Sequence, residues 1–451
     1  MRKEGKKILD SLIKHKSGII NQIMKTHSDQ IGTYRFFGNQ YIELEQIQSA
    51  IYRNCQESSS SGHILCIQDT SEINYSHLSG KLKANDRHIG PTGNEKEAGF
   101  FIHPVLALCA DDYFPIGFPS VKVWNRSWSK QDKYEREYHL ESIENKESYR
   151  WIESANQCKK VFDKGNMITV IGDRESDIYE EFVRVPDERT HLLVRSRGDR
   201  KLAENEGKLY QTLATSPLSS TYSISIRSHH GGKTRQAHIE VRYCKVKIAL
   251  PKNHSNRNLP AFVELWAVEA RENAEDIPEG EDPILWRLLT THEITDASKA
   301  IQIIQWYELR WQIEELFRTL KSQGLNVEGS QMGDGFSLKK LCLMALVASL
   351  QVMQLVLARD GEIKREASII FTTEEIQFLT ILCKHIEGKT EKQRNPFIPN
   401  SIAWASWIIA RIGGWNGYKS QAPPGHITMK RGLDSFNQQF QGWIMALKWQ
   451  T

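Results

Sequence analysis

Two aspartates each follow directly on a short apolar segment of the chain. Asp69 ends the segment HILCIQD (63–69), and Asp173 ends MITVIGD (167–173). Segments of this kind are typical of buried strands, and two such strands side by side would bring both carboxylates to one edge of a sheet. Close carboxylates repel each other unless a cation lies between them. Mg²⁺ and Mn²⁺ prefer such hard oxygen ligands, although a turn or helix cap would also explain either aspartate.

A third acid, Glu314, lies within a predicted helix over 297–323. At 100° per residue, one arc of about 80° on this helix collects an acid, a phenol and three cations. These residues are Tyr307, Arg310, Glu314, Arg318 and Lys321.

This charged arc has two interpretations. A solvated helix face with ion pairs such as Arg310–Glu314 and Glu314–Arg318 explains the charges. It does not explain the surrounding apolar residues Trp306, Trp311, Phe317 and Leu320. A carboxylate embedded among cations suits a metal ligand held beside phosphates.

The elements around the two aspartates predict a mixed sheet with helices on its faces, because a hairpin is followed by strand–helix–strand units. The predicted strands are 63–69, a hairpin over 100–124, 167–173 and 190–196, and the predicted helices are 143–162 and 176–184. Three later segments alternate apolar and polar residues, which indicates an antiparallel sheet inserted in the α/β core over 200–295. These segments are 221–227, 237–250 and 261–270.

Helices are predicted at both ends of the chain. Amphipathic spacing indicates helices over 6–26 and around 42–54, followed by the linker ESSSSGH (57–63). Beyond 323, helices are predicted at 337–358, 373–386, 401–411 and 432–448. The expected regions are an N-terminal helical region (1–60), a core in two parts (61–199 and 296–360), the β-rich insertion (200–295) and a C-terminal helical region (361–451).

The composition of the 451 residues excludes several classes of protein. With 39% hydrophobic and 25% charged residues, the chain resembles ordinary folded proteins rather than disordered, collagen-like or disulfide-stapled ones. Seven cysteines without a CxxC pair indicate reduced thiols, and the start lacks an apolar signal core, so we expect a cytoplasmic protein with no membrane span. The net charge of +4 decides little. Residues 1–26 hold seven Lys and Arg against two acids, which fits either a DNA contact or a solvated helix face.

The motifs together resemble a known family. The spacing Tyr307-x2-Arg310-x3-Glu314-x6-Lys321 resembles the YREK signature of bacterial insertion-sequence transposases of the IS-four type. IGDRESDIY (171–179) and IQDTSEINYSH (67–77) are similar to the second-acid and first-acid motifs of that family. Further similar strings occur in family order over nearly the whole chain, among them YRFFGN, FFIHP, KESYRW, LLVRS, LWRLLTTHEI, GGWNGYKS and PPGHITMKRG.

The resemblance implies an α/β, ribonuclease H-like catalytic core with a triad of Asp69, Asp173 and Glu314 that binds two Mg²⁺ or Mn²⁺ ions. It implies hydrolysis at the element's ends, a hairpin intermediate and transfer of the 3′-OH ends to target DNA. It also implies an N-terminal DNA-binding region, although the opening helix lacks the family's GD-x-RR-type sequence. The C-terminal helices would form a homodimer in the synaptic complex with double-stranded DNA, associated with the bacterial nucleoid.

Six residues are expected to contact DNA by this resemblance. They are Arg195, Trp286, Tyr307, Arg310, Arg318 and Lys321. Without the resemblance, Trp286 would be interpreted as an ordinary aromatic residue of a strand. Arg174, Glu175 and Asp177 would order the second-acid motif, whereas His103 and Cys66 are expected to be core residues.

Other functions remain open at this point. A ribonuclease H-like DNA endonuclease without strand transfer would share the triad. A catalytically silent DNA-binding inhibitor is disfavoured because all three acids are present. A two-carboxylate glycosidase is a distant alternative, because the cations around Glu314 do not suit a neutral sugar.

Overall fold

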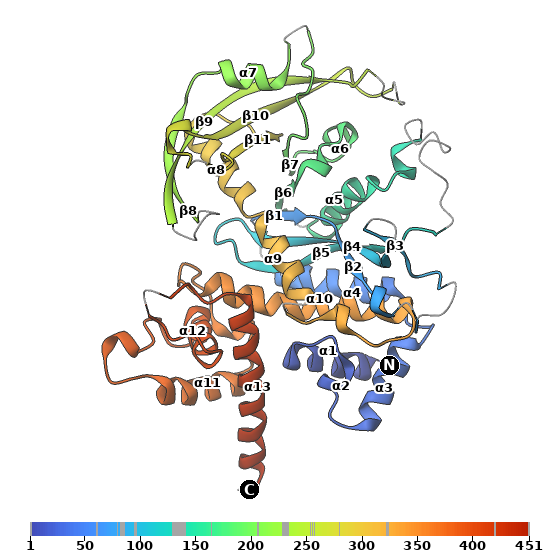
Figure 1. Ribbon diagram of the computed structural model, residues 1–451, viewed down its shortest axis with the longest axis vertical. Helices are drawn as coiled ribbons and strands as arrows, with labels where there is room; N and C mark the ends of the chain where they lie inside the picture. The colour runs from blue at the N-terminus through green and yellow to red at the C-terminus, as the bar shows by residue number, and fades with distance from the viewer. Residues whose placement is uncertain are drawn as a thin grey trace. The chain divides into compact units, whose positions relative to one another are not determined.

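The computed structural model of the protein consists of two compact units (Figure 1). Unit 1 comprises Met1–Ser59, Thr70–Lys130 and Gln312–Thr451, and unit 2 comprises Ser60–Asp69 and Gln131–Trp311. The structure describes residues 2–59, 62–78, 80–81, 86–93, 97–128, 141–163, 165–204, 207–227, 234–252, 254, 256, 258–278, 280–321, 324–418 and 421–449.

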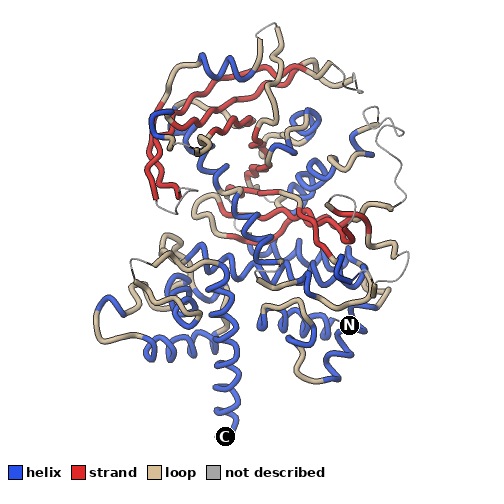
Figure 2. The backbone as a smooth tube through the Cα atoms, in the orientation of Figure 1, coloured by secondary structure: helices blue, strands red, loops and turns tan. Residues whose placement is uncertain are grey.

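Unit 2 contains a sheet of parallel and antiparallel strands (Figure 2). Its strands, in spatial order, are β1 (His63–Gln68), β6 (Met167–Gly172), β7 (Thr190–Arg195), β11 (Leu285–Thr290), β10 (Phe262–Glu272), β9 (Thr234–Ala249) and β8 (Ser220–Arg227). β1, β6 and β7 are parallel, and every later pair is antiparallel. The parallel strands are apolar runs buried on both faces, which is the usual state of parallel strands.

Helices cover the sheet of unit 2. The α-helices are α5 (Tyr149–Val161), α6 (Tyr179–Arg184), α7 (Leu209–Thr215) and α8 (Ala297–Glu308), and short 3-10 turns are η2 (Ile143–Asn145), η3 (Arg174–Ser176) and η4 (Ala274–Asp276). α5 packs on β1 and β6, whereas α7 and α8 pack on β9 and β10. Trp151 and Ile152 of α5 are fully buried, because the apolar stripe predicted for 143–162 faces the sheet.

These elements confirm the predicted strands at 63–69, 167–173 and 190–196 and the antiparallel strands after residue 220. β11 pairs directly with β7, so the antiparallel strands extend the parallel sheet of unit 2. That residues 200–295 are a family-specific insertion stays a prediction, as does the division into five regions.

Unit 1 combines a small antiparallel sheet with many helices. β4 (Glu97–Cys109) pairs with β2 (Ser71–Asn74), β3 (Gly90–Thr92) and β5 (Pro115–Trp124). The hairpin predicted over 100–124 is therefore confirmed. The helices and turns are α1 (Arg2–His15), α2 (Ile20–Ile23), α3 (His27–Gly38), α4 (Leu44–Ser58), α9 (Trp311–Leu320), α10 (Gly335–Ala358), α11 (Thr373–Ile386), α12 (Ile402–Ile412), α13 (His426–Trp449), η1 (Ser76–Leu78), η5 (Val327–Gly329), η6 (Ala367–Ile369) and η7 (Glu391–Gln393).

Helix α10 forms the centre of unit 1. It contacts α1, α3, α4, α12, α13 and β5. By length and composition α10 alone, among the described helices, is apolar enough to cross a membrane, yet 72% of its most apolar window is buried. The apolar run predicted as a buried helix over 337–358 is confirmed, since most of its residues are buried against these neighbours.

The helix predicted over 6–26 is wrong, because the chain forms α1 and α2 with a break between them. Lys16 adopts a left-handed conformation with φ 44°. Its buried Nζ donates to the Gln351 side chain at 2.6 Å on α10. A Cβ on Gly18 would lie 2.8 Å from the Cα of Val327, so only glycine allows this close approach. Packing against the rest of unit 1 interrupts the local periodicity.

The single helix predicted over 297–323 is also wrong, because α8 ends at Glu308 and α9 begins at Trp311. The backbone N–H groups of Leu309 and Arg310 both donate to the carbonyl oxygen of Tyr307, which tightens the last turn. The arc calculated for one straight helix therefore does not exist as such. Tyr307 lies on α8, Arg310 lies in the break, Glu314 and Arg318 lie on α9, and Lys321 follows its end.

Smaller differences concern the helical ends of the chain. Helix α3 is absent from the predicted elements, and α13 begins at His426 rather than at 432. The linker expected over 57–63 begins later, since α4 continues to Ser58, and residues 60–61 lie outside the described residues. His103 and Cys66 are both fully buried, as expected of core residues.

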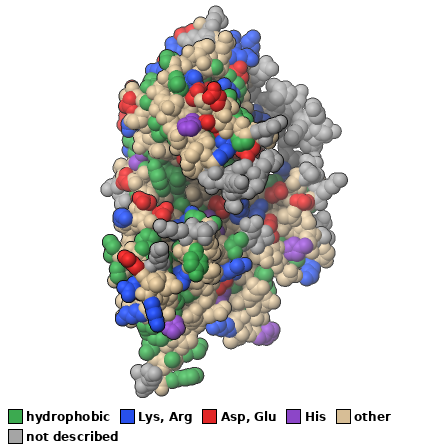
Figure 3. Space-filling model, turned by 60° about the vertical axis from the view of Figure 1, so that its left-hand side comes forward, with side chains coloured by type: hydrophobic (Ala, Val, Ile, Leu, Met, Phe, Trp, Pro, Cys, Tyr) green, Lys and Arg blue, Asp and Glu red, His purple; other side chains and the backbone are tan. Residues whose placement is uncertain are grey.

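Charged side chains are mixed on the visible surface. Lys and Arg side chains are interspersed with Asp and Glu over the face in Figure 3, in keeping with the small net charge of +4. Any DNA contact on this face would therefore depend on particular side chains rather than on a large field of one sign.

Candidate active site

The two strand-ending aspartates of unit 2 lie at the same edge of the sheet. β1 and β6 are parallel neighbours with Ile67 opposite Ile171. Asp69 and Asp173 each follow this pair by two positions, and both side chains are half-buried. The register alone therefore brings two carboxylates together, because parallel neighbours end at one edge.

An arginine from the break between α8 and α9 balances this negative charge. Arg310 Nη1 lies 3.4 Å from Asp69 Oδ2, and the two side chains are only 12% and 18% exposed. Asp173 is held differently: its Oδ1 accepts a hydrogen bond of 2.8 Å from the backbone N–H of Glu175. The break in the predicted helix thus places Arg310 against the first aspartate.

Four aromatic and cationic side chains, here called the wall, lie near the aspartates: Tyr307, Trp286, Arg195 and Arg310. Tyr307 is 4% exposed; burial raises its pKa, the nearby guanidinium groups of Arg310 and Arg195 lower it, and Asp173 raises it. The ring of Trp286 meets the ring of Tyr307 edge to face at 5.7 Å. Burial lowers the pKa of Arg195, although the Tyr307 hydroxyl opposes this effect. All four sequence-predicted residues of this wall and both aspartates therefore lie together in unit 2.

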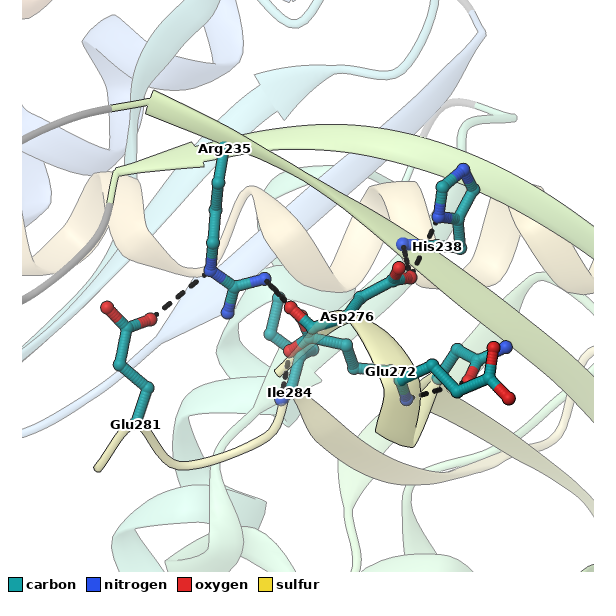
Figure 4. A network of polar contacts seen from close by, with 8 residues as sticks. Arg235, His238, Glu272, Asp276, Glu281 and Ile284 are labelled. Atoms are coloured by element: carbon teal, nitrogen blue, oxygen red, sulfur yellow. Dashed lines mark hydrogen bonds and ion pairs between the residues drawn. The ribbon is translucent and has the colours of Figure 1, made fainter. Parts of the chain in front are cut away.

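A polar network fixes the strand that carries Trp286 (Figure 4). The buried carboxylate of Glu272 pairs with Arg235, which also contacts Glu281 at 3.2 Å. The other oxygen of Glu272 accepts from the backbone N–H of Ile284 at 3.0 Å. The chain then enters β11, where the carbonyl of the next residue accepts a hydrogen bond of 3.0 Å from Arg195 Nη2. The network thus anchors the chain two residues before Trp286.

Two further acids of the second-acid motif, Glu175 and Asp177, make ion pairs with arginines. Glu175 pairs with Arg150 at 2.6 Å, and buried Asp177 pairs with Arg200 at 2.6 Å. The Asp177 carboxylate also accepts from the backbone N–H of Arg197 at 2.7 Å. These contacts tie the turn after β6 to its neighbours, and that Arg174, Glu175 and Asp177 order the motif stays a prediction.

The third predicted acid belongs to unit 1. Glu314 is half-buried on α9, and Arg318 on the same helix is 56% exposed and pairs with Glu315 at 2.6 Å. Glu315 also contacts His426 at 3.2 Å, beside a cavity of about 300 Å³ at the start of α13. Burial lowers the pKa of His426 to about 4. The membership of Glu314 in a triad stays a prediction.

The donor set fits a divalent cation with a preference for oxygen. Asp69 and Asp173 supply carboxylates directly after two neighbouring parallel strands, and the Arg310 guanidinium pairs with Asp69. Within the described ranges, no group of three or more His, Cys, Asp or Glu side chains forms a ready-made metal site.

Comparison with protein families matches residues 138–350 to the transposase DDE domain. The match includes Asp173 and Glu314 and begins after Asp69. It supports a DDE transposase with a mixed α/β fold of the ribonuclease H-like kind, a transposase or endonuclease function, and DNA as the partner. Such domains typically use divalent metal ions, which agrees with the oxygen donors at the sheet edge.

Proposed function

We propose that the chain is a DNA transposase that binds the inverted-repeat ends of an insertion sequence, cleaves them and joins the 3′-OH ends to target DNA. The observation that carries the proposal is the paired placement of Asp69 and Asp173 beyond the in-register strands β1 and β6, with Arg310 beside them. The matched transposase DDE domain over residues 138–350 supports the same reaction class.

The three acids have one common role in this proposal. Asp69, Asp173 and Glu314 would hold Mg²⁺ or Mn²⁺, two ions in all, which when bound supply positive charge to the attacking and leaving oxygens of the phosphodiester. The strands β1 and β6 end directly before Asp69 and Asp173, and the backbone N–H of Glu175 donates a hydrogen bond to the Asp173 carboxylate. Preorganised ligands of this kind cost no reorganisation when the DNA arrives.

We propose that the wall residues contact the phosphates and bases of the DNA. Arg310 and Arg195 would bind phosphate oxygens, because a guanidinium can donate two parallel hydrogen bonds to them. The Tyr307 hydroxyl is influenced by both cations and adds a donor. Arg318 and Lys321 would contact the DNA backbone from unit 1, since the Arg318 side chain is more than half exposed.

Trp286 has a separate proposed role in hairpin formation. Closing one strand on the other requires a base to leave the stack, which costs a few kcal/mol. A tryptophan face returns about 1–3 kcal/mol per stacked base. Trp286 is half-buried, and its ring packs edge to face against the ring of Tyr307, which supports the indole.

Assembly completes the proposal. Two ends must be cut and joined together, so a homodimer would form on DNA, with α12 and α13 contributing contacts and the N-terminal helices of residues 1–60 binding the ends. The far half of α13 fits this role, because Met445, Leu447 and Trp449 are 51%, 43% and 87% exposed. Large exposed apolar side chains gathered on one helix are typical of interaction surfaces.

The decisive experiment for this function is strand transfer. Duplexes that carry the inverted repeats flanking the reading frame are incubated with the protein, Mg²⁺ and a supercoiled target plasmid. Covalent joining of the 3′ ends to the plasmid is expected, and the Glu314→Gln variant should give none. Cleaved ends without any joined product would contradict a transposase and favour the runner-up, an endonuclease without strand transfer. Binding without cleavage would favour the silent inhibitor.

A further inference from the structure

A buried carboxyl group lies behind the two aspartates of unit 2. Glu181 on α6 is 0% exposed. Its Oε1 accepts a hydrogen bond of 3.2 Å from Gln68 Nε2, and its Oε2 accepts one of 2.8 Å from the Ser176 hydroxyl. Both partners are also fully buried. Sequence patterns gave no reason to single out this residue.

The two partners of Glu181 belong to the segments that carry the aspartates. Gln68 is the last residue of β1 and directly precedes Asp69. Ser176 ends the turn η3 that Asp173 caps. One carboxyl group therefore links the end of β1 to the turn that follows β6.

The surroundings are shaped for this link. A Cβ on Gly172 would meet the Ser176 Cβ and hydroxyl at 2.4 Å, so only glycine leaves room for the serine over the end of β6. An apolar side chain at position 181 would fill the same space without the cost of burying a carboxyl group. The buried carboxyl group of Glu181 is therefore better explained by its two hydrogen bonds than by the filling of space.

The charge state of the link suits its place. Burial raises the pKa of Glu181 to about 8, although the hydrogen bonds from Ser176 and Gln68 and the charge of Arg150 oppose this shift, while Asp177 adds to it. At neutral pH the group is therefore mainly a neutral carboxylic acid. It joins the two segments without adding a further negative charge behind the aspartates.

We propose that Glu181 is a positioning residue that sets the separation of the Asp69 and Asp173 carboxylates through its hydrogen bonds to Gln68 and Ser176. The inference rests on the proposed function, since it assumes that these carboxylates bind a divalent cation. Partners that orient metal ligands from behind typically change metal affinity or activity by about 10–100-fold when they are removed.

The test compares variants of the full chain. Glu181→Leu fills the space with an apolar side chain and removes both hydrogen bonds. Glu181→Gln puts a neutral amide there, which can both donate and accept hydrogen bonds. Glu180→Leu is the matched control: Glu180 is the preceding residue on α6, is 7% exposed and contacts His254 at 3.0 Å instead. Mn²⁺ binding without DNA is measured by titration calorimetry and by the loss of the free Mn²⁺ paramagnetic resonance signal. Thermal unfolding in chelator checks the fold of each variant.

The expected result is Mn²⁺ binding about 10–100-fold weaker for Glu181→Leu, with wild-type affinity regained by Glu181→Gln and kept by Glu180→Leu. Unchanged affinity in a folded Glu181→Leu protein would overturn the inference, and so would equal weakening by Glu180→Leu. If Glu181→Leu does not fold, Ser176→Ala removes one hydrogen bond with little loss of volume, and it must weaken Mn²⁺ binding for the inference to stand.

DNA cleavage separates this inference from the proposed function. If the wild type binds Mn²⁺ and Glu181→Leu weakens that binding, but no protein cleaves DNA, then the positioning role stands and the transposase proposal fails. If the wild type cleaves DNA and Glu181→Leu matches it in Mn²⁺ affinity, the positioning role alone fails. A wild type that binds no Mn²⁺ overturns the inference.

Discussion

The ion pair between Arg310 and Asp69 gives the sharpest prediction about the site without DNA. Replacing Arg310 by alanine leaves Asp69 half-buried beside Asp173 without its guanidinium. Removing one partner of a fully buried pair costs about 3–5 kcal/mol, and an exposed pair is worth about 0–1 kcal/mol. With side chains 12% and 18% exposed and a separation of 3.4 Å, the pair lies between these limits, so we expect a loss of about 1–3 kcal/mol.

This loss converts to a shift in melting temperature. For a unit of about 190 residues, such as unit 2, each kcal/mol shifts Tm by roughly 2–4 °C. Arg310→Ala should therefore melt about 2–12 °C below the wild type in chelator. Added Mn²⁺ should raise the Tm of the variant more than that of the wild type, because the ion then replaces the missing positive charge.

Differential scanning calorimetry with and without Mn²⁺ measures both effects. Arg318→Ala is the control: this arginine is 56% exposed and pairs with Glu315, which is 30% exposed, so its change should stay within about 0.5 kcal/mol. If Arg310→Ala and Arg318→Ala behave alike in chelator and in Mn²⁺, the reasoning about charge balance at Asp69 is refuted.

Three further predictions concern DNA and pH. Trp286→Ala should slow hairpin formation by roughly ten- to a hundredfold and spare the first nick, with Trp286→Phe retaining part of the rate; equal loss of both steps in a single-turnover assay would make Trp286 a core residue. Lys321→Ala should reduce the salt dependence of DNA binding by about one unit of slope, and an unchanged slope would exclude a phosphate contact. Burial lowers the pKa of His292 to about 2, so its neutral form contributes stability above pH 6.5 that is lost as pH falls below it, at about 1.4 kcal/mol per unit. His292→Asn should flatten that loss in urea unfolding between pH 6.5 and 4; parallel curves for variant and wild type would contradict it.

The strands that place the two aspartates could be predicted from local sequence. HILCIQ and MITVIG are short apolar runs, each followed by an acid. A run of this kind is enough to predict a strand that is buried on both faces. That the two strands are neighbours in register follows from long-range pairing, which local patterns do not encode. The same reason applies to the β7–β11 pair, by which the antiparallel strands extend the parallel ones.

The two breaks in predicted helices arise from tertiary contacts. At Lys16 the buried ammonium reaches Gln351 on α10, far away in sequence. At Leu309 and Arg310 no glycine or proline marks the end of α8, so helical periodicity continues through a position where the backbone tightens. The second break leaves Arg310 outside both helices, where its guanidinium pairs with Asp69.

The sequence identified some residues of the site and missed others. Helical spacing pointed to Tyr307 and Arg310, and the family resemblance pointed to Trp286 and Arg195; the structure has all four in unit 2. The sequence could not identify Glu181, because a single acid on a short helix is common and its hydrogen-bond partners are known only from the structure. The contacts that anchor β11 were hidden for the same reason, since each joins residues distant in sequence.

The most direct test of the central claim is single-turnover cleavage of an end-labelled duplex that carries the inverted repeat. Wild type, Asp69→Asn and Asp173→Asn are compared at equal DNA occupancy, with Glu180→Gln as a control for the loss of a buried acid in unit 2. We predict that both aspartate variants bind the duplex and leave it intact, while the control cleaves as the wild type does. Cleavage at the wild-type rate by either aspartate variant would contradict the account.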